Sequence, residues 1–212
     1  MSNHAGRDRW RLIVPLIIGA AFFFFPGPGN PFHDNGTSSY GDAIVVGSIS
    51  DARSLIPIIA SDSASAEVCS FLFNGLVKFD KDVNIAGDLA QGWEIQEDGL
   101  VIVFRLRRGV RWHDGEPFTA KDVEFTYKKL IDPQVKTPYS GDFERIRSLE
   151  VLDDYTVKVT YKEPFSPALA SWGMWIMPEH ALKGEDLNKT TFSRRPIGRA
   201  PTRSSPGRPV RR

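Results

Sequence analysis

Hydrophobic and polar residues alternate with a period of two along two stretches of the chain, residues 92–106 and residues 146–164. Such alternation is typical of half-buried β-strands, which place successive side chains on opposite faces of a sheet. Turn-forming residues interrupt each stretch, at Asp98-Gly99 and at Asp153-Asp154. We therefore predict that each stretch forms a β-hairpin.

A helical spacing of hydrophobic residues is found in residues 63–80. Val68, Phe71, Leu72 and Leu76 recur there at intervals that place side chains on one face of an α-helix. We therefore predict a helix over this range.

A turn followed by a helix start is predicted next. Asp114, which precedes a glycine, follows an alternating run and favours a hairpin turn. Thr119 and Asp122 have the spacing of a capping box, which predicts a helix from Thr119 to Leu130. His113 lies in the turn, where we expect an exposed imidazole rather than a catalytic one.

The order of these elements indicates the fold class. A strand over residues 43–49 and an irregular loop over residues 132–143 complete the pattern. Hairpins set between helices, without regular alternation of strand and helix, favour a mixed α/β (α+β) fold over a doubly wound one. No glycine-rich phosphate loop of a standard pattern is present in the sequence, which argues against a nucleotide-binding protein.

The charge of the chain is unevenly distributed. The full sequence has 27 basic and 26 acidic residues, but residues 194–212 contain seven arginines and no acid. The 193 residues before them therefore hold 20 basic and 26 acidic side chains. Because binding to nucleic acid requires a basic face, we expect no nucleic-acid partner for this body.

The N-terminus has the features of an export signal. Arg7, Arg9 and Arg11 precede the apolar run 12–25, a pattern typical of signal peptides. No cleavage site of small residues follows this run, so an uncleaved membrane anchor is the alternative. We assign residues 1–40 to a signal peptide or anchor plus a linker, and expect the rest of the chain to lie outside the cytoplasm.

Candidate chemistry in the body is sparse. Cys69 is the single cysteine and has the setting of a small residue packed on a helix. The sequence shows no paired metal ligands and no nucleophile motif, so we predict no metal, no cofactor and no catalytic residue. The alternative is an exported hydrolase that uses His113 or His180 with an acid.

Residues 89–133 resemble the signature region of the extracytoplasmic solute-binding proteins of ABC importers for oligopeptides, dipeptides and nickel (family 5). The order of the other parts agrees over about residues 42–197, namely "SISDARSLIP", "FNGLVKFD", "TPYSGDF" and "LEVLDDYTVKVTYKEPF". The resemblance implies a fold like that of type II periplasmic binding proteins. It also implies a monomer that captures a peptide and delivers it to an ABC permease without chemistry. The sequence does not identify the ligand among a dipeptide, an oligopeptide, a nickel chelate or another solute.

The resemblance also implies how the chain is divided and where a ligand binds. Residues 41–197 correspond to part of the first lobe, with an inserted hairpin and helix subdomain at about 61–165, while the closing domain is missing. For Tyr139, the alternative to contact with the ligand is a role in packing only. For residues 171–178, the alternative to lining the ligand site is a place in the core between domains. The predicted substrate-binding residues are Ser50, Asp51, Ala52, Arg53, Tyr139, Ser140, Trp172 and Trp175.

The C-terminal segment departs from the family pattern. Family members typically continue "IGTGPY", whereas this chain reads "IGRAPT" from Ile197. Loss of one base from codons for Thr-Gly-Pro-Tyr (ACG GGC CCC TAC) yields Arg-Ala-Pro-Thr, so we interpret residues 198–212 as a frameshifted, disordered tail. A basic arm is the alternative for this tail. We expect a truncated binding protein with impaired binding, or a fragment without activity.

Overall fold

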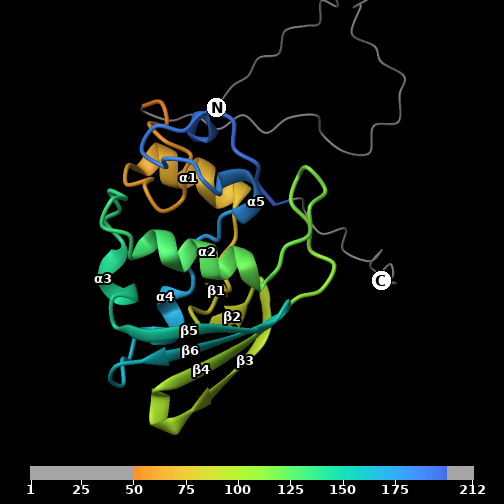
Figure 1. Cartoon of the computed structure of the whole chain (residues 1–212), viewed down its shortest axis with the longest axis vertical. Coiled ribbons are helices and arrows are strands. Elements are labelled where there is room, and N and C mark those ends of the chain that lie inside the picture. Colours follow the sequence, from red (N-terminus) through yellow and green to blue (C-terminus); the bar gives the residue numbers. More distant parts are fainter. Residues whose placement is uncertain (1–49, 200–212) are drawn as a thin grey trace, which may run out of the picture. The chain divides into compact units, whose positions relative to one another are not determined.

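The two predicted hairpins form one antiparallel sheet in the computed structural model, which describes residues 50–199 (Figure 1). The strand order is β3-β4-β6-β5, so β4 and β6 are the central pair. Both hairpins are confirmed, with turns at residues 97–99 and 154–155. The four strands are β3 (Ala90–Gln96), β4 (Val101–Leu106), β5 (Ile146–Asp153) and β6 (Thr156–Tyr161).

Helix α2 (Ala120–Leu130) lies across one face of this sheet (Figure 1). Val157, Val159 and Tyr161 alternate along β6 as fully buried residues, and Val123 of the helix is equally buried. The period-two pattern of the sequence therefore identifies the core face of the strand, as expected for a sheet covered on one side.

The predicted turn and capping box before α2 are both confirmed. The Thr119 N–H donates to Asp122 Oδ2 at 2.8 Å, and Thr119 Oγ1 accepts from the Lys121 N–H at 3.3 Å. In the turn, the N–H of Gly115 donates to the Trp112 carbonyl at 3.0 Å. Gly115 has a φ of 95°, a conformation that glycine adopts without steric cost.

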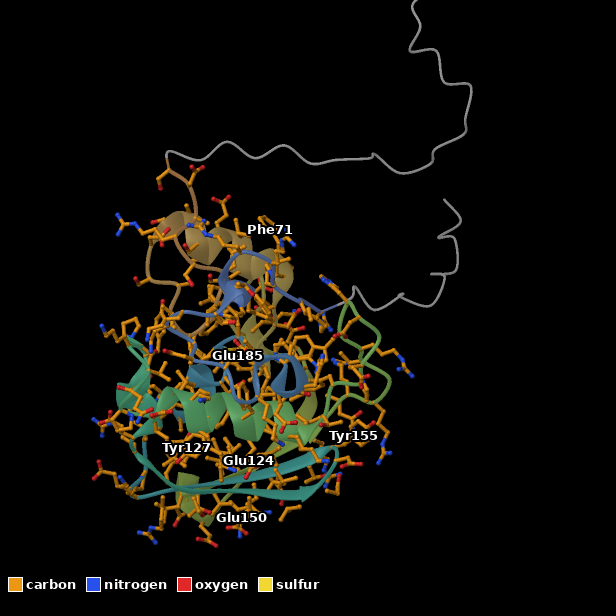
Figure 2. The ribbon with its side chains drawn as sticks, turned by 45° about the horizontal axis from the view of Figure 1, so that its top comes forward. Phe71, Glu124, Tyr127, Glu150, Tyr155 and Glu185 are labelled. Carbon is orange, nitrogen blue, oxygen red and sulfur yellow. The ribbon has the colours of Figure 1, made fainter. Side chains whose placement is uncertain are left out.

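The first helix is shorter than predicted, because α1 spans Ser63–Leu72 and the chain is extended from Phe73 onward. The prediction of a helix to residue 80 is therefore wrong. The four apolar residues with helical spacing divide: Leu76 is buried and Leu72 is half-buried, whereas Phe71 is 72% exposed and Val68 is 37% exposed. Phe71 lies on the outer side of α1 (Figure 2). The predicted burial of Cys69 is confirmed.

A backbone connection explains why α1 stops. Asn74-Gly75 is a dipeptide typical of turns, and the N–H of Leu76 donates to the carbonyl of Trp172 at 2.8 Å instead of continuing the helix. The residues that follow form a small antiparallel sheet of two strands. These strands are β1 (Val77–Phe79) and β2 (Ile85–Gly87).

Short helices and loops connect the sheet to the rest of the described chain. The loop predicted over residues 132–143 is irregular up to residue 139 and ends in one helical turn. Three other short helical segments follow the second hairpin. The four are α3 (Ser140–Phe143), α4 (Ala168–Ser171), α5 (Glu179–Leu182) and the 3-10 segment Thr191–Ser193.

An aromatic cluster occupies the centre of the core. The Trp172 ring lies 5.6 Å from that of Phe104 and 5.3 Å from that of Phe143, between ring centroids. The Trp172 indole N–H donates to the hydroxyl of Tyr161 at 3.1 Å, and that hydroxyl donates to the Ala168 carbonyl at 3.1 Å. These buried polar groups are therefore satisfied.

Several predictions from the sequence lie outside residues 50–199, namely the strand 43–49, the apolar run 12–25 and residues 200–212 of the tail. The first two residues of the predicted tail are described and bonded: the Gly198 carbonyl accepts from the His113 N–H at 2.9 Å, and the Arg199 N–H donates to the Leu72 carbonyl at 2.8 Å. Within the described range, no helix has the length and apolar character needed to cross a membrane.

Candidate functional site

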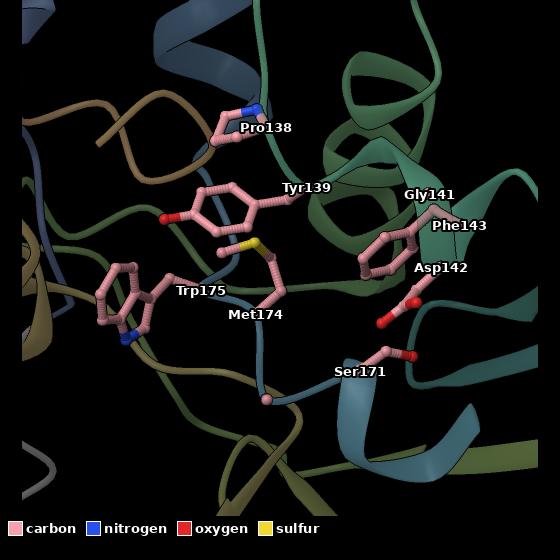
Figure 3. A pocket seen from close by; sticks show the side chains of 9 residues that line it. Pro138, Tyr139, Gly141, Asp142, Phe143, Ser171, Met174 and Trp175 are labelled. Carbon is pink, nitrogen blue, oxygen red and sulfur yellow. The ribbon is translucent and has the colours of Figure 1, made fainter. Parts of the chain in front are cut away.

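Two segments that the sequence analysis singles out, residues 139–143 and 171–178, meet at a hollow of about 450 Å³ (Figure 3). We call it the aromatic hollow. Aromatic rings, a methionine and a few polar groups in one concave site are a combination typical of small-ligand sites. Its lining residues are Pro138, Tyr139, Gly141, Asp142, Phe143, Ser171, Gly173, Met174 and Trp175.

Two hydrogen bonds, one from its side chain and one from its main chain, hold Tyr139 in place. Its hydroxyl donates to the Ala60 carbonyl at 2.8 Å, and its N–H donates to Thr137 Oγ1 at 3.1 Å. The hydroxyl is thus bonded within the protein, and the part of Tyr139 that faces the hollow is its ring (Figure 3). A rigid aromatic face of this kind provides contact area at little cost in conformational entropy.

The opposite wall is positioned by the chain that follows α1. The N–H of Leu76 donates to the Trp172 carbonyl, and the N–H of Ile176 donates to the Asn74 carbonyl at 2.9 Å. Met174 and Trp175 lie between these two bonds. The Met174 side chain points toward the Tyr139 ring, while the Trp175 ring extends to the left in Figure 3. The residues that line this wall are thus anchored to the scaffold on both sides.

Among residues 50–199, Asp142 is the one charged side chain that lines the aromatic hollow. It is exposed and lies beside Ser171, whose hydroxyl donates to the Ala168 carbonyl at 2.9 Å (Figure 3). Burial raises the pKa of nearby Tyr161, and the charge of Asp142 adds to that increase. The site is therefore an aromatic and apolar hollow with a single negative group at its edge.

Two predicted site residues do not line the aromatic hollow. Trp172 is 1% exposed and belongs to the aromatic cluster of the core, with Phe104 and Phe143. Ser140 begins α3, is half-buried and is absent from the lining. Both residues are adjacent in sequence to lining residues.

The predicted segment 50–53 also lies apart from the lining of the aromatic hollow. The N–H of Arg53 donates to the buried Ser65 hydroxyl at 2.8 Å, and the Ala52 carbonyl accepts from the Arg194 guanidinium at 3.0 Å. Ser50 and Asp51 are exposed. The main-chain N–H of Arg53 and the main-chain carbonyl of Ala52 are therefore bonded within the protein.

The two histidines considered for catalysis have different settings. His113 is exposed, as expected, and its Nε2 lies 2.6 Å from the Arg199 carbonyl. His180 pairs with Asp114, with Nε2 and Oδ2 2.7 Å apart. Among residues 50–199, neither imidazole has a hydrogen bond to a hydroxyl or thiol, which is the contact that a base needs to activate a nucleophile.

Cys69 and Asp122 have structural roles. Burial raises the pKa of the Cys69 thiol to about 11, which disfavours the reactive thiolate. Asp122 is buried and accepts N–H bonds from Thr119 and Glu179. In the described part of the chain, no three His, Cys, Asp or Glu side chains are grouped so that they could hold a metal ion.

Comparison with protein families gives one match over more than half of the chain. A sequence profile of the bacterial extracellular solute-binding proteins, family 5, middle region, matches residues 84–201. Protein XP55 of Streptomyces lividans is 32% identical over 209 residues, which are 93% of this chain and 38% of XP55. The oligopeptide-binding protein AppA of Bacillus subtilis is 32% identical over 174 residues, 78% of this chain and 32% of AppA.

Solved structures give the same correspondence. AppA of Bacillus subtilis in complex with a nonapeptide superposes with a TM-score of 0.66 at 29% identity, over 71% of this chain and 31% of AppA. NikZ of Campylobacter jejuni in complex with Ni(L-His) superposes with a TM-score of 0.65 at 33% identity, over 70% of this chain and 30% of NikZ. The chain thus spans about a third of the length of these relatives.

Proposed function

This chain belongs to the bacterial extracellular solute-binding proteins of family 5, and on that premise we propose that it binds peptides for import by an ABC transporter. The observation that supports a binding role most directly is the meeting of two sequence-distant segments at the aromatic hollow. The relatives AppA and NikZ are described in complex with a nonapeptide and with Ni(L-His). Both ligands contain amino acids.

The lining of the aromatic hollow fits a short peptide. The rings of Tyr139 and Trp175 face an apolar space that suits a peptide side chain. Asp142 at its edge suits an ammonium group, because opposite charges attract, and its exposure to water keeps this attraction weak. We expect these residues alone to bind weakly, near millimolar, because Asp142 is exposed and much of a ligand in this hollow stays in contact with water.

A non-enzymatic role is proposed for the same chain. The alternative is a hydrolase that uses His180 with Asp114, or His113. The relative AppA, named as an oligopeptide-binding protein, and the lack of a hydroxyl or thiol bonded to either histidine in residues 50–199 favour binding. The variants His113→Ala and His180→Ala are expected to retain peptide binding. Hydrolytic activity in the parent that is lost in either variant would show that the chain is an enzyme.

The proposed partners and location follow from the family. We propose that the protein works outside the cytoplasm and delivers its ligand to the membrane subunits of the transporter. Fractionation of cells that express the chain is expected to place it in the extracytoplasmic fraction. A soluble cytoplasmic pool with an intact N-terminus would contradict this location.

Titration of peptides into the 212-residue chain tests the binding role. Trp175→Ala removes one wall of the aromatic hollow, whereas Trp93→Ala removes a half-buried tryptophan of β3 outside that hollow. We expect Trp175→Ala to weaken binding at least about tenfold, or about 1.4 kcal/mol, and Trp93→Ala to leave it unchanged. NMR chemical-shift titration measures weak affinities of this kind. Equal affinity of both variants and the parent would reject the site.

A further inference from the structure

A second hollow, of about 580 Å³, has a lining dominated by positive charge. We call it the basic hollow. It lies where the small sheet meets the end of β4, and no residue of the aromatic hollow lines it. Four cationic side chains and one carboxylate surround it. Its lining residues are Lys78, Gly87, Asp88, Gln91, Arg107, Arg108, Val110 and Arg199.

Two of its guanidinium groups are fixed through Nε. Arg107 Nε donates to the Asp88 carbonyl at 2.6 Å, and Arg199 Nε donates to Asn74 Oδ1 at 2.8 Å. Within residues 50–199, the terminal nitrogens of these two side chains make no hydrogen bond. A guanidinium anchored in this way keeps its two terminal nitrogens available for an oxyanion, which it can bind with two parallel bonds.

The remaining charges do not neutralise the hollow. Asp88 already accepts from the Asn74 amide at 2.6 Å and lies 3.7 Å from Lys78 Nζ. Arg108 lies over the Tyr155 ring, with Cζ 4.6 Å from the ring centroid, which holds its side chain in place. Cations gathered around one concavity repel one another and attract an anion.

We propose that the basic hollow is a binding site for an oxyanion, a carboxylate or phosphate group held by Arg107 and Arg199 and attracted by Lys78 and Arg108. The chemistry needed is a compact group with at least two oxygens and a negative charge. This site is separate from the aromatic hollow and does not depend on the proposed peptide function.

The oxyanion has two possible sources. One is a free small anion. The other is the terminal carboxylate of a peptide, because a third hollow shares Gly173 and Trp175 with the aromatic hollow and Lys78 and Asp88 with the basic hollow. Only this second source rests on the proposed function.

Calorimetry with inorganic phosphate at constant ionic strength tests the site in the 212-residue chain. We expect saturable binding that Arg107→Gln and Arg199→Gln each weaken at least about tenfold, since hydrogen bonds to charged groups are among the strongest in proteins. Arg147→Gln removes the same charge from an exposed position of β5, outside the hollow, and is expected to bind phosphate like the parent. A thermal melt identifies any variant that fails to fold. If Arg107→Gln or Arg199→Gln does not fold, phosphate binding by the other variant tests the site.

Two peptides that differ only in a free or amidated C-terminus distinguish the sources. Preference for the free acid that disappears in Arg107→Gln would assign the site to the peptide carboxylate, while phosphate binding without such a preference would assign it to a free anion. Absence of saturable phosphate binding, or equal weakening by Arg147→Gln, would overturn the proposal. Peptide binding that fails while phosphate binding persists would count against the peptide function alone.

Discussion

A Cβ atom on Gly75 would lie 2.6 Å from the carbonyl oxygen of Gly173. These two residues are nearly a hundred positions apart, and their close crossing joins the segment after α1 to the segment that carries Met174 and Trp175. Because both segments meet through backbone atoms rather than through a flexible side chain, neither can move aside easily. The absence of a side chain at residue 75 is therefore a requirement of the aromatic hollow.

Gly75→Ala is expected to destabilise the protein by about 1–3 kcal/mol, because an extra methyl group in a tight contact forces the backbone apart. The same substitution at Gly92, where a Cβ would meet no atom within 4 Å, is expected to change stability little. Urea unfolding of both variants measures the difference. Equal stabilities would show that the crossing relaxes without cost.

Tyr139→Phe separates the structural role of this residue from its role as a wall. The substitution removes the hydroxyl that donates to the Ala60 carbonyl at 2.8 Å and keeps the ring. We expect a loss of about 0.5–1.5 kcal/mol of stability, the usual contribution of one such bond, and little change in ligand affinity. A large loss of affinity with unchanged stability would mean that the hydroxyl contacts the ligand.

Much of the scaffold could be predicted from the sequence because its signals are local. Alternation in residues 92–106 and the Thr119 and Asp122 pair each depend on neighbouring residues, and both predictions are confirmed. The helix over 63–80 fails because apolar spacing continues past the turn dipeptide Asn74-Gly75, after which Leu76 bonds to Trp172, far away in the sequence. Spacing of apolar residues alone does not reveal such a bond.

The candidate site is predictable only in part for the same reason. Tyr139 and Trp175 belong to segments that the sequence singles out, and both line the aromatic hollow. Trp172 lies three residues from Trp175 but faces the core, and composition does not distinguish the two orientations. The basic hollow was not predicted, because its cations come from β1, the end of β4 and residue 199, and the fold alone brings them together.

Asp122→Asn tests how one buried carboxylate connects α2 to α5. Asp122 Oδ2 accepts from the Thr119 N–H and Oδ1 accepts from the Glu179 N–H, each at 2.8 Å. An amide has one acceptor oxygen, so one of these N–H groups loses its partner, and we expect a loss of about 1–3 kcal/mol. Glu124→Gln, which breaks a surface ion pair with Lys128 on the same helix, is expected to cost at most about 0.5 kcal/mol.

Denaturant unfolding of the two variants provides the measurement. Burial raises the pKa of Asp122, and the N–H bonds from Thr119 and Glu179 offset that increase only in part. A carboxyl whose folded pKa is raised favours the folded state more at low pH than at high pH. The cost of Asp122→Asn is therefore expected to be largest in acid, and a cost that grows with rising pH would contradict this reading.

The pairing of Asp114 with His180 predicts a second pH dependence, of opposite sign. Burial would raise the pKa of Asp114, but the bond from the His180 ring and the Glu116 N–H together lower it below its ordinary value. A carboxyl whose folded pKa is lowered contributes stability above its unfolded pKa, near 4, and this contribution is lost as pH falls through the folded pKa. Asp114→Asn removes the contribution at every pH. We therefore expect the parent to exceed Asp114→Asn in stability at pH 5 and this difference to shrink by pH 3.

The difference in unfolding free energy between the parent and Asp114→Asn reports on Asp114 alone. Other carboxyls also have a lowered pKa, among them Asp62, Asp153 and Asp186. These groups titrate in both proteins and cancel. His180→Gln provides a second comparison, because it removes the ring that holds Asp114 ionised while leaving the Glu116 N–H in place. We expect the stability of His180→Gln to fall less steeply between pH 5 and pH 3 than that of the parent. An equal loss of stability in the parent, Asp114→Asn and His180→Gln would show that the Asp114–His180 pair contributes nothing in this range.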